Sequence, residues 1–486
     1  MAKLYVIGIG GTGSRVLKSL TMLMAAGVRV ENDKQIPYDI VPVIIDPDHA
    51  AADLTRTVKL MYDYNKVYNS IDHNNSGKNK FFGTKINMDI LPEVRLPLEN
   101  TLNFDFKDYI GMSDMKDVNN VPNANFALVS TLFSKKNLDA KMEVGFKGNP
   151  NIGTVVLNQF ALTKEWTDLV ASFGPDDRIF IISSIFGGTG ASGFPLLLKK
   201  IRSVDEMLPG CKNIKDSVIG AITVLPYFDV KPNAKSEIDS STFMSKTKAA
   251  LSYYDRNMTE ANMIYYIGDE QKKQYENSEG GAKQQNNAHF IELASALAIV
   301  DFARQTDLKT VDGKPSNIYY KEFGIREEVE EIIFENLDSF TNLTIEKPLV
   351  SFILFCKYMN ERMPQSIGKQ PWSMDLNYDN NFERSQFYGV LLKDIRTAFL
   401  QWLKEMADNS RAFTPFDLRV KPNDLFELIK GVKPARVFSI DRNYDLFDSY
   451  LNGCIRRVSR GSSKENVFME LFYMAINDLV HDKFRL

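Results

Sequence analysis

The chain contains few of the residues that hold small domains together through covalent bonds or metal ions. Its 486 residues include three cysteines and four histidines. Because Cys211, Cys356 and Cys454 are far apart and odd in number, they offer no disulfide framework and no CxxC site. The scattered histidines likewise exclude a zinc site with recognisable spacing. We therefore predict a protein of a reducing, cytoplasmic compartment.

Long apolar runs and a large excess of one charge are also missing. The longest apolar run, Leu349–Cys356, is far shorter than the ~20 residues that cross a bilayer, so we predict a buried helix or strand there. Lys3 leads directly into a strand-like segment, which leaves no room for a secretory leader. With 59 basic and 62 acidic residues, the net charge of −3 gives no general attraction for nucleic acid or an anionic membrane. We expect neither nucleic-acid binding nor membrane insertion.

What is present is the composition of an ordinary globular protein, in a chain too long for one typical core. Hydrophobic residues make up 44% and charged residues 25%. Buried strand patterns dominate residues 1–310, with an insertion of loops and short elements at about 69–141. In residues 311–486 apolar residues recur at helical spacing, over Arg326–Phe340, Gln386–Met406, Leu425–Gly431, Tyr444–Val458 and Glu465–Phe484.

A first glycine turn follows the opening strand, Lys3–Gly8. The turn and the start of the helix beyond it consist of Gly10, Gly11, Thr12, Gly13 and Ser14. Gly8–Gly13 also satisfies the dinucleotide fingerprint GxGxxG in its strand–turn–helix setting. That interpretation requires an acid about 20 residues farther on, whereas the second strand ends in Asp46 at a greater distance. A Rossmann enzyme using NAD or FAD, or an adenylating enzyme of the ubiquitin-activating type, remains an alternative.

A second glycine turn lies at the centre of the chain. The β-branched run Ile179–Ile182 predicts a buried strand, and a helical pattern opens at Ser192. Between them, glycines that tolerate positive φ let an anion approach the backbone N–H groups and the positive end of the helix dipole. The alternative is a tight turn in which glycine serves packing alone. The candidate phosphate-binding residues here are Gly187, Gly188, Thr189, Gly190, Ala191 and Ser192.

Two further segments are candidates for the same ligand. Gly148, Asn149 and Pro150 stand at a predicted helix entrance, where Lys147 is a candidate charge partner of a phosphate. That helix is predicted to run past Leu157 toward Trp166. At the carboxyl end of the second strand, Asp46 and Asp48 face either the ligand or a helix starting at Ala50, which they would cap.

Together these segments resemble the tubulin and FtsZ family of GTP-binding proteins, in a divergent, bacterial-type form. The order Gly-Gly-Thr-Gly, followed by small residues and Pro195, is similar to the family's signature loop, although Phe186 replaces its usual first glycine. Asn149-Pro150 with Gly153 matches the γ-phosphate-sensing loop in register. Asp46 matches the loop whose acid lies near the phosphates and the bound Mg²⁺.

The resemblance implies further roles. Pro226 and Tyr227 stand where the family has its sugar-contacting loop, although an aromatic residue at a strand end also serves as a core plug. Asn287 is the candidate for the guanine base, with Asn286 as helix cap and His289 as a plain helix-face residue. The candidate catalytic acids are Asp307 and Asp312, although neither has a motif around it and each has the alternative of a solvated helix end.

The sequence therefore predicts an α/β fold, with a doubly wound, mostly parallel sheet of the tubulin/FtsZ type followed by a mainly α-helical C-terminal domain. The resemblance implies that GTP or GDP binds with Mg²⁺, held mainly through the phosphates, and that GTP hydrolysis at a protomer interface is linked to head-to-tail self-assembly into a filament or a closed oligomer. A partner protein on the C-terminal helices is a further expectation. A structural GTP binder without hydrolysis is a second alternative, alongside the Rossmann enzyme.

Overall fold

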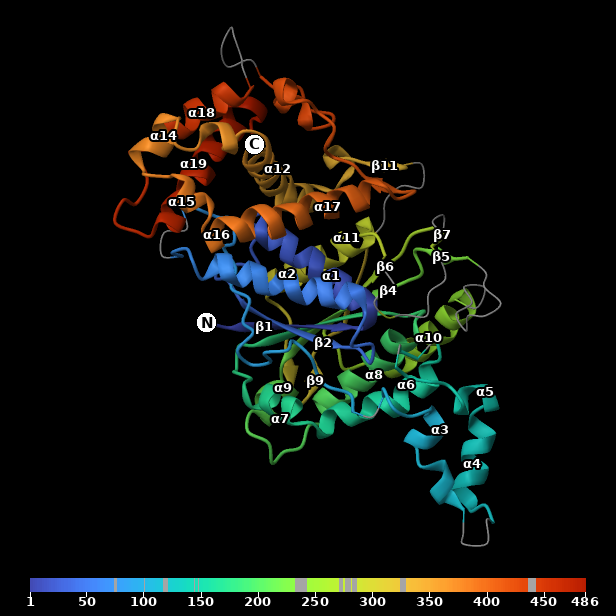
Figure 1. Ribbon diagram of the computed structural model, residues 1–486. Helices are drawn as coiled ribbons and strands as arrows, with labels where there is room; N and C mark the ends of the chain where they lie inside the picture. Colours follow the sequence, from blue (N-terminus) through green and yellow to red (C-terminus); the bar gives the residue numbers. More distant parts are fainter. Residues whose placement is uncertain are drawn as a thin grey trace.

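The structure, a computed structural model, describes residues 1–73, 77–99, 101–116, 121–143, 145–146, 148–231, 243–270, 274–275, 281, 286–323, 329–435 and 443–486. A six-stranded sheet forms its centre (Figure 1), with the strand order β10-β6-β4-β3-β1-β2 and parallel pairing throughout. The strands are β1 (Lys3–Ile9), β2 (Asp39–Ile45), β3 (Arg178–Ser184), β4 (Val218–Val224), β6 (Met263–Ile267) and β10 (Tyr319–Phe323).

The chain reverses its direction of winding at β1. It passes from β1 to β2 on one side and then returns to place β3 on the other side. Open α/β sheets bind their ligands at such a switch point, outside the carboxyl ends of the strands. We call this side of the sheet the carboxyl edge and the opposite side the amino edge.

Both faces of the sheet are covered, as a parallel sheet requires. Successive side chains point to opposite faces, so Leu4 and Val6 join one hydrophobic cluster while Tyr5 and Ile7 join the other. Above the sheet in Figure 1 lie α1 (Gly10–Ala25), α2 (Ala52–Tyr68) and α11 (Phe290–Arg304). Below it lie α6 (Pro150–Leu157), α7 (Lys164–Ala171), α8 (Gly188–Arg202), α9 (Cys211–Lys215) and α10 (Phe243–Asn257).

The predicted insertion contributes to the sheet edge and to a projecting arm. Ile86 and Arg95 form isolated parallel bridges to Ile40 and Ile44 of β2, so this segment follows the edge strand without becoming a regular strand. Beyond it, a group of short helices extends away from the body of the protein (Figure 1). This arm comprises α3 (Phe106–Tyr109), η1 (Met112–Met115), α4 (Ala124–Leu132) and α5 (Lys135–Leu138).

The C-terminal region is helical and packs on the layer of α1, α2 and α11. Trp402 Nε1 donates to Ser19 Oγ at 3.2 Å, and Lys18 pairs with Glu405 at 3.2 Å. One hydrophobic cluster runs from the sheet into these helices. They are α12 (Ser339–Glu361), α13 (Met363–Ser366), α14 (Pro371–Asp375), α15 (Asn380–Glu383), α16 (Gln386–Gly389), the π-helical turn Val390–Ile395, α17 (Arg396–Ala407), α18 (Asn443–Cys454) and α19 (Lys464–Phe484).

The predicted doubly wound sheet and the helical C-terminal region are confirmed. The predicted helix Arg326–Phe340 is wrong over its described part, because β11 (Glu331–Ile332) and a 3-10 turn precede α12. The helix predicted past Leu157 is broken, since Thr163 caps a separate α7. The division at residue 310 stays a prediction, although β10 of the sheet lies beyond it.

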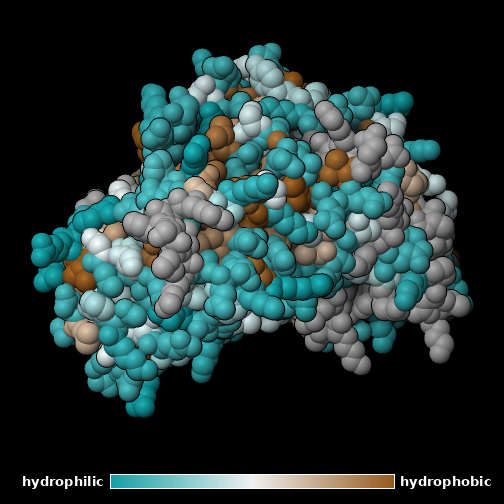
Figure 2. All heavy atoms as spheres, turned by 90° about the horizontal axis from the view of Figure 1, so that it is seen from above, coloured by the Kyte–Doolittle hydropathy of each residue, from teal (hydrophilic) through white to brown (hydrophobic). Residues whose placement is uncertain are grey.

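The outer surface is mostly polar on the side of the C-terminal helices. Figure 2 looks at the molecule from above and shows hydrophilic residues over most of that face, with apolar residues in small areas between them. Within the described ranges, no helix has both the length and the apolar character that crossing a membrane requires.

Gly220 in β4 provides a test of how tightly α11 packs on the sheet. A Cβ there would lie 2.6 Å from Cδ2 of Phe302 and 2.8 Å from Cδ2 of Phe180. We expect Gly220→Ala to lower the free energy of unfolding by about 1–3 kcal/mol in urea titrations. Gly453→Ala in α18, with nothing within 4 Å of the new Cβ, should instead add about 0.5–1 kcal/mol. Equal urea midpoints for Gly220→Ala and Gly453→Ala would contradict the close packing of α11 on β4.

Candidate functional site

Two glycine turns meet at the switch point between β1 and β3. Gly10 has φ +73 and is the first residue of α1, directly after β1. A Cβ on Gly10 would lie 3.5 Å from Cβ of Thr189 and 3.9 Å from N of Gly190. Segments separated by more than 170 residues in sequence are therefore in contact at the carboxyl edge.

The third predicted segment joins them from the other side. A Cβ on Gly188 would lie 3.1 Å from the backbone N of both Gly148 and Asn149. A Cβ on Gly145 would lie 3.8 Å from the hydroxyl oxygen of Thr189. The predicted phosphate partner Lys147 lies outside the described residues. The turns before α1, α6 and α8 thus form one continuous surface of backbone.

The three helices that start at this surface have no side-chain caps. The N-cap residues Ile9, Asn149 and Gly187 make no capping hydrogen bond, and none of the three first turns contains an acid. Other helices of the chain are capped, for example α7 by Thr163 and α12 by Asp338. Helix starts without a side-chain cap or an acid in the first turn, together with three helix dipoles, favour an anion at this place.

The start of α8 differs from the prediction and is supported by a tyrosine. The helix begins at Gly188 instead of Ser192, so Pro195 lies inside it. Proline has no N–H for the carbonyl of Ala191, and the Tyr254 hydroxyl donates to that oxygen instead, at 3.3 Å. The Ser192 hydroxyl donates to the Gly188 carbonyl at 2.7 Å and faces Gly153 of α6, where a Cβ would clash with its oxygen.

A buried charged cluster lies directly behind the first turn of α1. Arg15 Nε pairs with Glu292 at 2.6 Å and Nη1 with Asp53 at 3.2 Å. Its Nη2 donates to the Tyr227 hydroxyl at 2.8 Å and to the Thr12 hydroxyl at 3.4 Å. Burial alone would lower the pKa of Arg15, but the surrounding hydroxyl and carboxylates raise that pKa well above its ordinary value. This arginine fixes α1 relative to α2 and α11.

Tyr227 is a buried member of this cluster. Its side chain is 2% exposed, and its hydroxyl donates to Glu292 at 2.9 Å. Burial raises the pKa of Tyr227 well above its usual value. The ring packs between Phe228, at a centroid distance of 5.0 Å, and His289, also at 5.0 Å. In this structure Tyr227 plugs the core beside the candidate site, as the alternative prediction stated.

A cation that sequence reasoning missed lies at the third turn. Lys246 comes from α10, and its Nζ would be 3.1 Å from a Cβ on Gly148. The same lysine lines a cavity of about 450 Å³ that also borders Pro150, Ala191 and Ser192. Lys246 is one of two lysines in α10, beside Lys248, and the sequence contained no signal that distinguished it.

Asp46 and Asp48 follow β2 at the same edge, and neither caps α2. Asp46 Oδ1 accepts from the Asp48 N–H at 3.0 Å, while Asp48 accepts from Ala50 N at 3.1 Å and from Gly281 N at 2.6 Å. The predicted capping role is wrong because α2 begins at Ala52, beyond these turns. Burial raises the pKa of Asp46 to about 7. No metal-binding group of three or more His, Cys, Asp or Glu side chains exists among the described residues.

The start of α11 also differs from the prediction. His289, expected to be a plain helix-face residue, is its N-cap, because His289 Nδ1 accepts from Ile291 N at 3.1 Å. Glu292 completes a capping box by accepting from His289 N at 3.1 Å. Asn286 is therefore not the cap, and Asn287 lies half-buried just before it.

The two candidate catalytic acids lie at the amino edge, at the other end of α11. Arg178, the first residue of β3, donates to the carbonyl of Gln305 at 2.7 Å, which places the end of α11 at this edge. Asp307 and Asp312 follow it, and both are exposed. Asp312 lines a small cavity with Asp216, next to the start of β4. The structure thus separates these acids from the glycine turns of the same chain.

Asp46 leads to a pH test of the carboxyl edge. Its pKa is raised from 3.8 to about 7, so its contribution to stability is complete below pH 4 and is lost as the pH rises through 7. Between pH 4 and 8 we expect the wild type to lose on the order of 2–4 kcal/mol of unfolding free energy relative to Asp46→Asn. Asp89→Asn, at an exposed position, should follow the wild type. If the unfolding free energies of the wild type and Asp46→Asn change with pH in parallel, the burial of this carboxyl is contradicted.

The comparison with known proteins found structural similarity alone. No protein-family model matches the chain, and no curated protein matches it. Among solved structures, CetZ2 from Haloferax volcanii, described as a GTPγS-bound protofilament, is similar at 13% identity with a TM-score of 0.28. The match covers 63% of this chain and 60% of that one. The chain thus spans about three fifths of the length of that solved protein.

Proposed function

We propose that the chain is a tubulin-like protein that binds a guanine nucleotide at the carboxyl edge. One observation carries the proposal: α1, α6 and α8 begin side by side, without caps and without acids. Three converging helix starts suit a ligand with several phosphates, since each can satisfy a different group of oxygens. The resemblance of Gly187–Pro195 and Asn149–Gly153 to the tubulin and FtsZ family adds the choice of guanine.

The remaining contacts of the nucleotide follow from the same arrangement. Asn287 precedes α11 at this edge, and its amide has a donor and an acceptor for a purine. Pro226 stands next to the buried Tyr227 and borders the sugar. Mg²⁺ would be held mainly through phosphate oxygens and waters, because Asp46, the candidate carboxylate at this edge, is buried and accepts from the N–H of Asp48. When bound, Mg²⁺ neutralises phosphate charge.

We propose further that GTP hydrolysis is linked to self-association, and the separation of the acids from the glycine turns supports this. The 15 residues of α11 extend over ~22 Å between the two edges. Asp307 and Asp312 are therefore out of reach of a nucleotide bound to their own chain. A second chain, stacked head to tail, presents these acids to that nucleotide, and such a contact generates filaments when the rotation does not close.

A dinucleotide enzyme is the second candidate, favoured by one observation. A Cβ on Gly13 would lie 2.5 Å from the carbonyl carbon of Gly8, which is the close helix–strand packing that the GxGxxG fingerprint provides. Such an enzyme needs an acid that accepts from the ribose hydroxyls. Asp46 is unsuited to this role, because it is buried and already accepts from the N–H of Asp48. A dinucleotide also leaves the turn at Gly148 without a role.

The nucleotide that remains bound through purification separates these candidates. We expect GTP or GDP in the supernatant of heat-denatured protein, and preferential retention of labelled GTP over ATP and NAD. Bound NAD, FAD or ATP would favour the second candidate. Phosphate release then tests turnover, because a structural GTP binder releases none at any protein concentration.

Lys246 tests the position of the phosphates. We expect Lys246→Met to weaken GTP binding about 10–100-fold, since a charge-assisted hydrogen bond to an anion contributes about 1.5–3 kcal/mol. Lys248→Met, two residues away on an exposed part of α10, should bind GTP like the wild type. Fluorescent-GTP titration measures both variants. Equal GTP affinities of Lys246→Met and the wild type would show that Lys246 does not contact the phosphates.

Mixing two inactive variants tests the shared active site. Asp307→Asn/Asp312→Asn keeps its glycine turns but lacks the acids, whereas Lys246→Met keeps the acids and stays empty at low GTP. An equimolar mixture should recover a substantial part of wild-type phosphate release, because each chain supplies what its neighbour lacks. If each separate variant is inactive and the mixture stays inactive as well, the acids do not act across an interface.

A further inference from the structure

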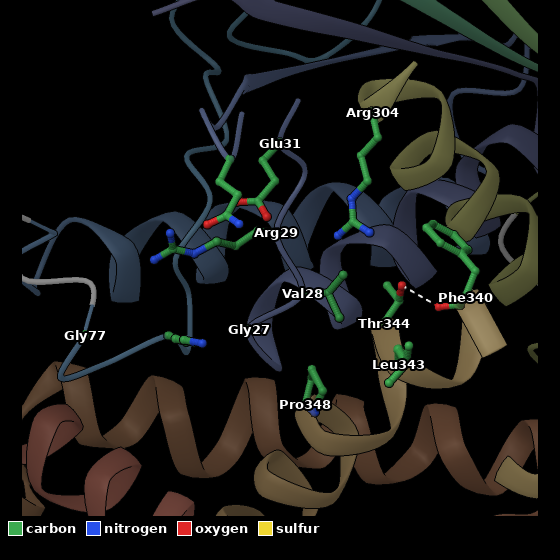
Figure 3. A pocket seen from close by; sticks show the side chains of 12 residues that line it. Gly27, Val28, Arg29, Glu31, Gly77, Arg304, Phe340, Leu343, Thr344 and Pro348 are labelled. Atoms are coloured by element: carbon green, nitrogen blue, oxygen red, sulfur yellow. Dashed lines mark hydrogen bonds between the residues drawn. The ribbon is translucent and has the colours of Figure 1, made fainter. Parts of the chain in front are cut away.

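A second pocket lies at the amino edge, between the sheet layer and the C-terminal helices. It has a volume of about 480 Å³, within the range of small-molecule sites. The segment after α1, the end of α11 and the first half of α12 form its walls. Figure 3 shows Arg304 reaching from α11 toward Val28 and Thr344, and Arg29 on the side of Gly77.

The side chains that line this pocket carry an excess of positive charge. Arg29, Lys80 and Arg304 line it, against one acid, Glu31. None of the three cations forms an ion pair within the part of the chain that the structure describes. Arg29 Nε is buried and has no acceptor among the described residues, which is unfavourable for a charged donor.

One cation is already oriented for a ligand. The guanidinium of Arg304 lies over the Phe340 ring, with its central carbon 5.3 Å from the ring centroid. Stacking fixes the plane of the guanidinium and leaves its N–H groups for a planar or tetrahedral anion. Beside it, Leu343 and Pro348 give the pocket an apolar wall.

We propose that this pocket binds a small organic anion, with a phosphate or carboxylate group on Arg304 and an apolar part against Phe340 and Leu343, while Arg29 contributes positive charge on the side of Gly77. The ligand connects the ends of α1 and α11, which begin at the carboxyl edge, with α12 of the C-terminal region. The proposal is independent of nucleotide binding, because none of these residues lies at the glycine turns.

Phenyl phosphate and phthalate are suitable probes, since each combines a ring with an anionic group, one as a phosphate and one as carboxylates. Isothermal titration calorimetry should detect at least one of them with a Kd below a few millimolar, weakening as salt rises. Benzyl alcohol, uncharged, should not bind. Arg304→Gln should weaken binding at least tenfold, whereas the exposed Arg256→Gln should bind like the wild type.

Two substitutions of opposite charge at one exposed position, at the mouth of the pocket, test the proposal even if an arginine variant misfolds. Leu343 is 83% exposed, so both Leu343→Glu and Leu343→Lys should fold. We expect the glutamate variant to weaken binding at least tenfold and the lysine variant to bind at least as well as the wild type. Absence of binding at 10 mM of either probe, or equal affinity in the two Leu343 variants, would overturn the proposal.

Discussion

A buried chain of alternating charges determines how the layers of this protein fit together. Glu292, Arg15 and Asp53 form its centre, and Arg56 continues it from Asp53 toward Glu405 of α17. Buried ion pairs add little net stability over apolar packing, but loss of one partner leaves a charge unpaired at a cost of about 3–5 kcal/mol. The cluster therefore specifies one arrangement of α1, α2, α11 and the C-terminal helices. It also fixes the first turn of α1, on which the candidate site depends.

The layered architecture could be predicted because its signals are local. The β-branched run Ile179–Ile182 and the glycines after it specify a buried strand and a turn without reference to the rest of the chain. The helical spacing of Glu465–Phe484 likewise predicted α19 almost to its ends. The glycine turns were placed at one edge by a general rule for parallel sheets, and the contact between Gly10 and Thr189 agrees with it.

What the sequence did not reveal depends on tertiary contacts. Helix α8 starts before its apolar pattern because Tyr254, from another helix, supplies the donor that Pro195 lacks. His289 caps α11 although Asn286 is the better capping residue by type, because the backbone turns into the helix three residues later. In the sequence, Arg15 looks like any polar residue of an amphipathic helix, because its partners Asp53 and Glu292 come from α2 and α11. Lys246 becomes relevant through its distance from Gly148 alone.

The missing caps of α1, α6 and α8 have a consequence for the life of the protein without its ligand. Three adjacent helix starts have no side-chain cap, whereas α7 and α12 are capped by Thr163 and Asp338. An anion that binds the folded form alone adds RT ln(1 + [L]/Kd), about 2.7 kcal/mol at a hundredfold excess over Kd. If the chain binds the proposed anion, a shortage of that anion would make the chain easier to unfold and to degrade.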